Sequence, residues 1–134
     1  MSSTYELELK STFSETEKVP DFVESVANRA GLKNELKEKI MLALSEAATN
    51  AIVHGNKENN KKLVSIVVDI TSNWVEIQVK DEGEGFNPDD LPDPTKDENL
   101  LNPGGRGIFL IEEFADKVNY GDEGRLVIMK FKRP

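Results

Sequence analysis

Residues 46–56 of this chain read Glu46-Ala-Ala-Thr-Asn50-Ala-Ile-Val-His54-Gly55-Asn56. They close a helix predicted from about residue 34 to residue 54, because apolar residues recur there at helical spacing. Side chains at i and i+4 share one helix face about 6 Å apart, so Glu46 and Asn50 point the same way. Gly55 and Asn56 supply the C-terminal stop. The run predicts a carboxylate and a carboxamide side by side, and the alternative is two polar residues on the solvent face.

Strand and helix patterns continue on both sides of this helix. A strand is predicted over 5–10, and the helix that follows it ends at Gly31. Downstream, two alternating stretches joined by a short turn predict a hairpin, and a helix and a second hairpin follow. The ranges predicted there are 63–70, 74–79, 105–116, 117–120 and 126–131. The order β-α-α-β-β-loop-α-β-β predicts the α+β class.

Composition limits the classes of function. The length of 134 residues predicts one domain over 1–134, without cysteines to cross-link it. No apolar run approaches the roughly 20 residues that span a bilayer, and the N-terminus lacks a signal-peptide pattern, so we expect a cytoplasmic protein without a membrane partner. The net charge of −8 argues against direct nucleic-acid binding. An acidic surface can steer a basic protein partner, or it can serve solubility alone.

A second motif, Asp81-Glu-Gly83-Glu-Gly85-Phe86, follows directly on a predicted strand. Its glycines permit positive φ and let the backbone approach a ligand closely. A carboxylate at this point can accept a hydrogen bond from the exocyclic amine of a purine. The alternative is an ordinary Asp-Gly turn, with Phe86 anchoring the loop in the core.

A third motif, Gly104-Gly105-Arg106-Gly107-Ile108, opens the helix predicted over 105–116. Free N–H groups and the positive end of the helix dipole form an anion site at such a position. Arg106 adds a charged fork suited to phosphate. The alternative is a flexible glycine hinge. Between the second and third motifs, residues 87–103 hold four of the six prolines and predict a long loop.

In this order, the three motifs resemble the N, G1 and G2 boxes of the GHKL ATPases. The resemblance implies a two-layer α/β sandwich of Bergerat type, a mixed sheet covered by helices on one face, and an ATP lid at about 87–103. It implies that Glu46 is the catalytic base, that Asn50 binds nucleotide and holds Mg²⁺, and that Asp81 binds the adenine amino group. The other nucleotide-binding residues that it implies are Gly83, Gly85, Phe86, Gly104, Gly105, Arg106, Gly107 and Ile108.

Among these ATPases, the chain resembles the anti-sigma-factor serine kinases, because it is a stand-alone domain whose one histidine lies inside the first motif. The resemblance implies ATP and Mg²⁺ as cofactors, and a sigma factor and an anti-sigma-factor antagonist as partners. Its members phosphorylate a serine on the antagonist in a partner-switching cycle, and they are often homodimers. Two alternatives stay open: an ATP-binding module that sequesters a partner with little kinase activity, and a kinase whose target lies outside sigma regulation. The chain departs from the family in residues 124–129, where members often carry a Thr near adenine and this chain has none.

Overall fold

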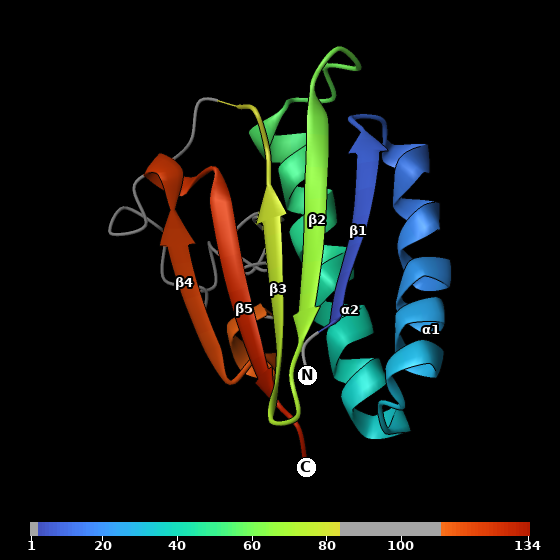
Figure 1. Cartoon of the computed structure of the whole chain (residues 1–134). Coiled ribbons are helices and arrows are strands. Elements are labelled where there is room, and N and C mark those ends of the chain that lie inside the picture. Colours follow the sequence, from blue (N-terminus) through green and yellow to red (C-terminus); the bar gives the residue numbers. More distant parts are fainter. Residues whose placement is uncertain (1–2, 84–110) are drawn as a thin grey trace, which may run out of the picture.

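Five strands form one sheet in the order β1-β2-β3-β5-β4 (Figure 1). The structure is a computed structural model, and it describes residues 3–83 and 111–134. The strands are β1 (Ser3–Lys10), β2 (Leu63–Ile70), β3 (Trp74–Lys80), β4 (Lys117–Gly121) and β5 (Leu126–Lys132). Each predicted strand is confirmed within two residues at either end. The turn at 71–73 joins β2 and β3 as predicted, with the Thr71 N–H donating to the Trp74 carbonyl oxygen at 2.9 Å.

Every strand pairing in the described sheet is antiparallel, so the prediction of a mixed sheet is wrong. The chain passes through two helices between β1 and β2, which returns it in the opposite direction. Strands β3 and β4 run in the same direction, but β5 lies between them and pairs with both. In the final hairpin, β5 pairs with β3 and β4 lies at the outer edge. Parallel strands are therefore not neighbours in the described sheet.

The helices lie on one face of the sheet, which confirms the predicted α+β two-layer architecture (Figure 1). They are α1 (Lys18–Ala30) and α2 (Asn34–Asn50), with a short 3-10 turn, η1 (Phe13–Glu17), before α1. Residues 111–114 are also helical and belong to the helix predicted over 105–116. Gly31 ends α1 at φ 68°, a left-handed conformation that glycine adopts without steric cost.

The core fills the space between the sheet and these helices. In β2 and β3 every second residue points into it and is at most 4% exposed, whereas the neighbouring residues are not buried; β1 and β5 add three more buried residues. The buried strand residues are Leu9, Val64, Ile66, Val68, Ile70, Val75, Ile77, Val79, Met129 and Phe131. Helix α2 meets them with mostly small side chains near its C-terminal end, including Ala43, Ala47 and Ala48. Small residues let the end of α2 lie close to the sheet, where the second motif begins.

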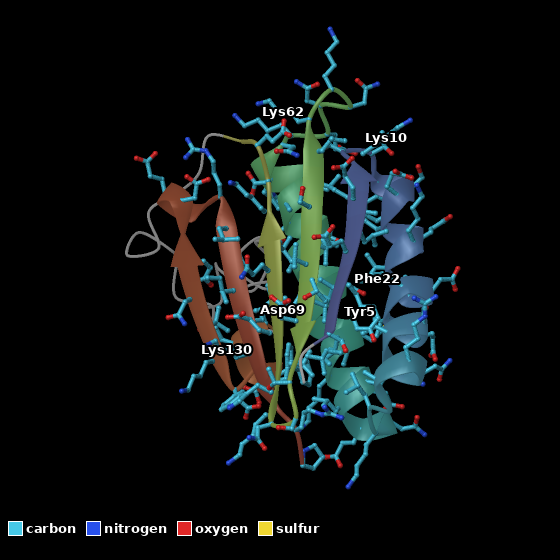
Figure 2. All side chains as sticks on the ribbon, in the orientation of Figure 1. Tyr5, Lys10, Phe22, Lys62, Asp69 and Lys130 are labelled. Carbon is cyan, nitrogen blue, oxygen red and sulfur yellow. The ribbon has the colours of Figure 1, made fainter. Side chains whose placement is uncertain are left out.

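The other face of the sheet carries polar and charged side chains. Figure 2 shows Asp69 and Lys130 on this face, turned away from the helices. Asp69 Oδ1 accepts a hydrogen bond from Thr4 Oγ1 at 2.6 Å, and Lys130 Nζ lies 3.8 Å from a carboxylate oxygen of Glu76. Of the helices described, none is long and apolar enough to cross a membrane.

Leu44→Ala tests the core between α2 and the sheet. Leu44 is fully buried, so we expect a loss of about 2–5 kcal/mol in the free energy of unfolding, measured by urea denaturation. Leu42 lies on the same helix and is 52% exposed, so Leu42→Ala should change stability by no more than about 0.5 kcal/mol. Equal losses for the two variants would contradict this packing of α2.

Candidate functional site

The polar residues of the site gather at one end of the sheet. Strand β1 ends there and β2 begins there, as the positions of Lys10 and Lys62 show in Figure 2. Strand β3 ends at the same end of the sheet and β5 starts from it, beside the C-terminal end of α2 (Figure 1). Segments far apart in the sequence therefore meet at this end of the sheet, which we call the junction.

Helix α2 changes its winding as it reaches this end of the sheet. The turn η2 (Ala51–Gly55) is a π-helix, in which the Asn56 N–H donates to the Ala51 carbonyl oxygen at 2.8 Å. The prediction extended a regular helix to residue 54, so the end of the helix is predicted correctly and its winding is not. Lys57 and Glu58 follow with φ of 52° and 55°. Single π turns are frequent at functional sites, and this one lies inside the first motif.

Asp81 extends from the end of β3 into this junction and is only 9% exposed. Its N–H donates to the Arg125 carbonyl oxygen at 2.9 Å, and its Oδ1 accepts the Gly83 N–H at 2.8 Å. Burial raises the pKa of Asp81 above its ordinary value of 3.8, while the Gly83 hydrogen bond and the positive charge of Arg125 act in the opposite direction. The carboxyl group is thus held in place and partly desolvated, as an acceptor for a ligand would be.

Gly55 and Gly83 pack backbone against backbone beside Asp81. A Cβ on Gly55 would lie 2.6 Å from both Cγ and Oδ2 of Asp81, and a Cβ on Gly83 would overlap the Gly55 carbonyl oxygen. Positive φ was one predicted reason for glycine in the second motif, but φ at Gly83 is not positive. Glycine is required at this position because the end of α2 leaves no space for a side chain.

Glu46 and Asn50 occupy the last turns of α2, one helical turn apart as predicted, and both are partly buried. The Asn50 Nδ2 atom is buried and has no hydrogen-bond partner within the described ranges. A buried carboxamide nitrogen without a partner is rare and points to a ligand or to another segment of the chain. His54, which follows on η2, is exposed.

Two residues of this junction were missed by the sequence-based prediction of the site. Asn56, predicted only as a helix stop, is 1% exposed and hydrogen-bonds to three different segments. Arg125, in the turn before β5, donates from Nε to the Gly83 carbonyl oxygen at 2.7 Å. Neither position has a periodic signal, because both act through side-chain contacts with residues distant in the sequence.

The remaining predicted site residues lie outside the described part of the chain. They are Gly85, Phe86, Gly104, Gly105, Arg106, Gly107 and Ile108, together with the predicted lid at about 87–103. Their roles stay predictions. Among residues 3–83 and 111–134, no three side chains of His, Cys, Asp or Glu are grouped as a metal site.

Comparison with known proteins finds matches along most of the chain. The profile of the histidine kinase-like ATPase domain matches residues 9–131. The chain is 34% identical over 113 residues to a serine-protein kinase RsbW of Oceanobacillus iheyensis, covering 80% of this chain and 72% of the relative. It is 35% identical over 114 residues to a serine-protein kinase RsbW of Staphylococcus aureus, with the same coverage of each chain.

A solved structure supports the fold independently. The crystal structure of the RsbU and RsbW domains of a Mycobacterium tuberculosis protein superposes with a TM-score of 0.69 at 17% sequence identity. The match covers 98% of this chain but spans only 33% of that longer one. The chain therefore belongs to the histidine kinase-like ATPase domain family, and within it to the group of the serine-protein kinases RsbW.

Gly55→Ala tests the close packing of the two glycines. The new Cβ would force Asp81 to move, so we expect a loss of about 1–3 kcal/mol of stability by thermal denaturation. Gly121→Ala is the matched control. Its Cβ would meet Leu126 Cδ2 at 3.4 Å, an ordinary contact, so stability should change by no more than about 0.5 kcal/mol. A Gly55→Ala protein as stable as the Gly121→Ala protein would show that the junction is looser than described.

Asp81→Asn tests the buried carboxylate through pH. A raised native pKa means that the folded state holds the proton of Asp81 more tightly than the unfolded chain does. The charged carboxylate therefore lowers stability at neutral pH, and this cost disappears as pH falls through the native pKa towards 3.8.

Asparagine avoids that cost and keeps an oxygen to accept the Gly83 N–H. We expect the melting temperature of the variant at pH 7 to equal or exceed that of the wild type, and the difference to shrink as pH falls to 4. A variant less stable than the wild type by the same amount at every pH would contradict the burial argument.

Proposed function

We propose that this chain is an ATP-dependent serine/threonine protein kinase that acts as an anti-sigma factor. It would phosphorylate a Ser or Thr of an anti-sigma-factor antagonist, in a cycle that switches the chain between the antagonist and a sigma factor. The observation that carries the proposal is the junction where the buried Asp81 carboxyl packs on Gly55, at the end of the helix that bears Glu46 and Asn50. The relatives named as serine-protein kinases support the same activity.

Asp81 is the residue that we assign to base recognition. Adenine presents an amine where guanine presents a carbonyl oxygen. A fixed carboxylate therefore accepts a hydrogen bond from the adenine amine and repels the guanine oxygen. Gly83 donates to Oδ1, and within the described residues no donor is bonded to Oδ2. The second oxygen therefore remains available to accept from the amine.

Asn50 is the residue that we assign to Mg²⁺. Its carboxamide is partly buried, and the donor Nδ2 has no partner in the part of the chain that the structure covers, as expected for a group that pairs with an acceptor atom of a ligand. The carboxamide oxygen is the kind of hard ligand that Mg²⁺ prefers, and one or two protein oxygens suffice beside phosphates and water. When bound, the ion would neutralise the charge of the phosphates.

Glu46 is the residue that we assign to proton transfer. It would accept the proton of the acceptor hydroxyl while that oxygen attacks the terminal phosphorus of ATP, and ADP would leave. The N–H groups of the motif from Gly104 to Ile108, with Arg106, would steady the phosphates as the start of a helix does. An ATP-binding module that only sequesters a partner needs no base, so Glu46 favours the kinase.

The wider setting of this activity is also proposed. The chain would act as a single domain over 1–134, with the segment at about 87–103 closing over the nucleotide. We expect it to work in the cytoplasm, on protein partners rather than on nucleic acid or membrane, and to form a homodimer.

Calorimetric titration with ATP and Mg²⁺ separates binding from chemistry. The wild type and Glu46→Gln should bind ATP equally, and Asp81→Asn should bind it much more weakly, because of these two residues it is Asp81 that we assign to the base. Transfer from radiolabelled ATP to purified antagonist proteins should fall about 10²- to 10⁴-fold in Glu46→Gln, the usual contribution of a general base.

Glu38→Gln is the matched control, because Glu38 lies exposed on the same helix. It should bind ATP and transfer phosphate like the wild type. Full transfer by Glu46→Gln would contradict the assigned base. A wild type that binds ATP but phosphorylates no antagonist would favour the binding module.

A further inference from the structure

The turn of residues 81–83, which carries Asp81, is held by side-chain hydrogen bonds from two sides. On one side, Asn56 Oδ1 accepts the Glu82 N–H at 2.7 Å. On the other side, Arg125 Nε donates to the Gly83 carbonyl oxygen at 2.7 Å. The two side chains therefore bind consecutive residues of the turn: Asn56 accepts from Glu82, and Arg125 donates to Gly83.

Asn56 is itself fixed by the ends of two strands. Its Nδ2 donates to Ser11 Oγ at 2.7 Å and to the Leu63 carbonyl oxygen at 3.1 Å. Ser11, which is fully buried just after β1, donates in turn to the Lys62 carbonyl oxygen at 2.7 Å. A carboxamide bonded at both ends cannot rotate without losing a buried hydrogen bond. The end of α2 is thus connected through Asn56 to β1, β2 and the turn.

Arg125 is fixed by the chain that precedes it. Its Nη1 donates to the Asp122 carbonyl oxygen at 3.2 Å and to Glu123 Oε2 at 3.2 Å, both in the short 3-10 turn η4 (Asp122–Gly124). Its own carbonyl oxygen accepts the Asp81 N–H at 2.9 Å. Arg125 therefore holds the turn through both its backbone and its side chain, and its positive charge favours the ionised form of Asp81.

We propose that Asn56 and Arg125 are positioning residues that hold the Asp81 turn in the geometry required to select adenine before the nucleotide binds. This proposal rests on the proposed function, in which Asp81 recognises the base. A carboxylate fixed in advance loses no conformational entropy when the ligand arrives, and it cannot turn aside to accommodate a carbonyl oxygen. Loss of either side chain should therefore weaken ATP binding and also reduce the preference for ATP over GTP.

Selectivity distinguishes positioning from a contribution to folding alone. A residue that only stabilises the fold changes the melting temperature but leaves the ratio of ATP to GTP affinity unchanged at temperatures where the protein is folded. A residue that positions Asp81 changes this ratio. The dissociation constants for the two nucleotides, measured by calorimetry with Mg²⁺ well below the melting temperature, therefore provide the readout.

Arg125→Met is the first variant to measure. We expect ATP binding to weaken about 5- to 10-fold, the effect of losing one partly buried hydrogen bond, and the preference for ATP over GTP to fall. Arg125→Lys should recover part of both, because an ammonium group can still donate to the Gly83 carbonyl oxygen. Arg133→Met is the matched control: Arg133 also donates to backbone carbonyl oxygens, of Thr71 at 2.6 Å and of Ala30 at 3.3 Å, but at the opposite end of the sheet. Its affinity and selectivity should equal those of the wild type.

Asn56→Ala tests the other side of the turn. It should lower affinity and selectivity in the same way, whereas Asn59→Ala should change neither. Asn59 lies in the same loop, and its side chain accepts a local hydrogen bond from the Lys61 N–H at 3.0 Å, with no bond to another segment in the part of the chain that the structure covers. If Asn56→Ala does not fold, Ser11→Ala removes only one of the bonds that fix the carboxamide, and a smaller loss in the same direction is expected.

The outcomes separate this proposal from the proposed function. Folded Arg125→Met and Asn56→Ala proteins with the affinity and selectivity of the wild type would overturn the positioning roles, while ATP binding by the site would stand. Equal losses for ATP and GTP would also overturn the positioning roles, since the effect would then be independent of the base. A wild type that binds no ATP would overturn the proposed function, and this proposal with it.

Discussion

The contact between Gly55 and Gly83 determines where everything else in the site can lie. Neither residue has a side chain, so the turn after β3 can rest directly on the last residue of the π turn after α2. The Asp81 carboxyl then lies against Gly55, where any Cβ would strike it. The first motif carries Glu46 and Asn50, and the second carries the buried Asp81. They form one site because the backbones of Gly55 and Gly83 are in contact.

This arrangement has a cost in stability that the surroundings partly offset. Burial disfavours the charged form of Asp81, and Asn50 Nδ2, which has no partner among residues 3–83 and 111–134, is unfavourable because it is buried. The Gly83 N–H and the positive charge of Arg125 act against the penalty on Asp81. A site that keeps polar groups poised for a ligand gives up stability that an apolar junction would retain.

Local patterns predicted most of the elements. Alternation gave the strands because every second residue of β2 and β3 is buried, and Gly31 marked the end of α1 because it adopts positive φ. The four described site residues, Glu46, Asn50, Asp81 and Gly83, lie at the ends of the elements predicted to bear them. The mixed sheet was wrong, because strand order depends on packing of the final hairpin and leaves no periodic trace.

Periodicity and turn residues are local properties of the chain, and they were enough to predict the elements, the α+β class and the order of the motifs. Three features required the folded chain: the position of β5 between β3 and β4, the π turn after α2, and the hydrogen bonds by which Asn56 and Arg125 hold the Asp81 turn. Each of these depends on contacts between residues far apart in sequence. Such contacts form only when apolar faces pack together and buried polar groups must find partners, which no single segment specifies.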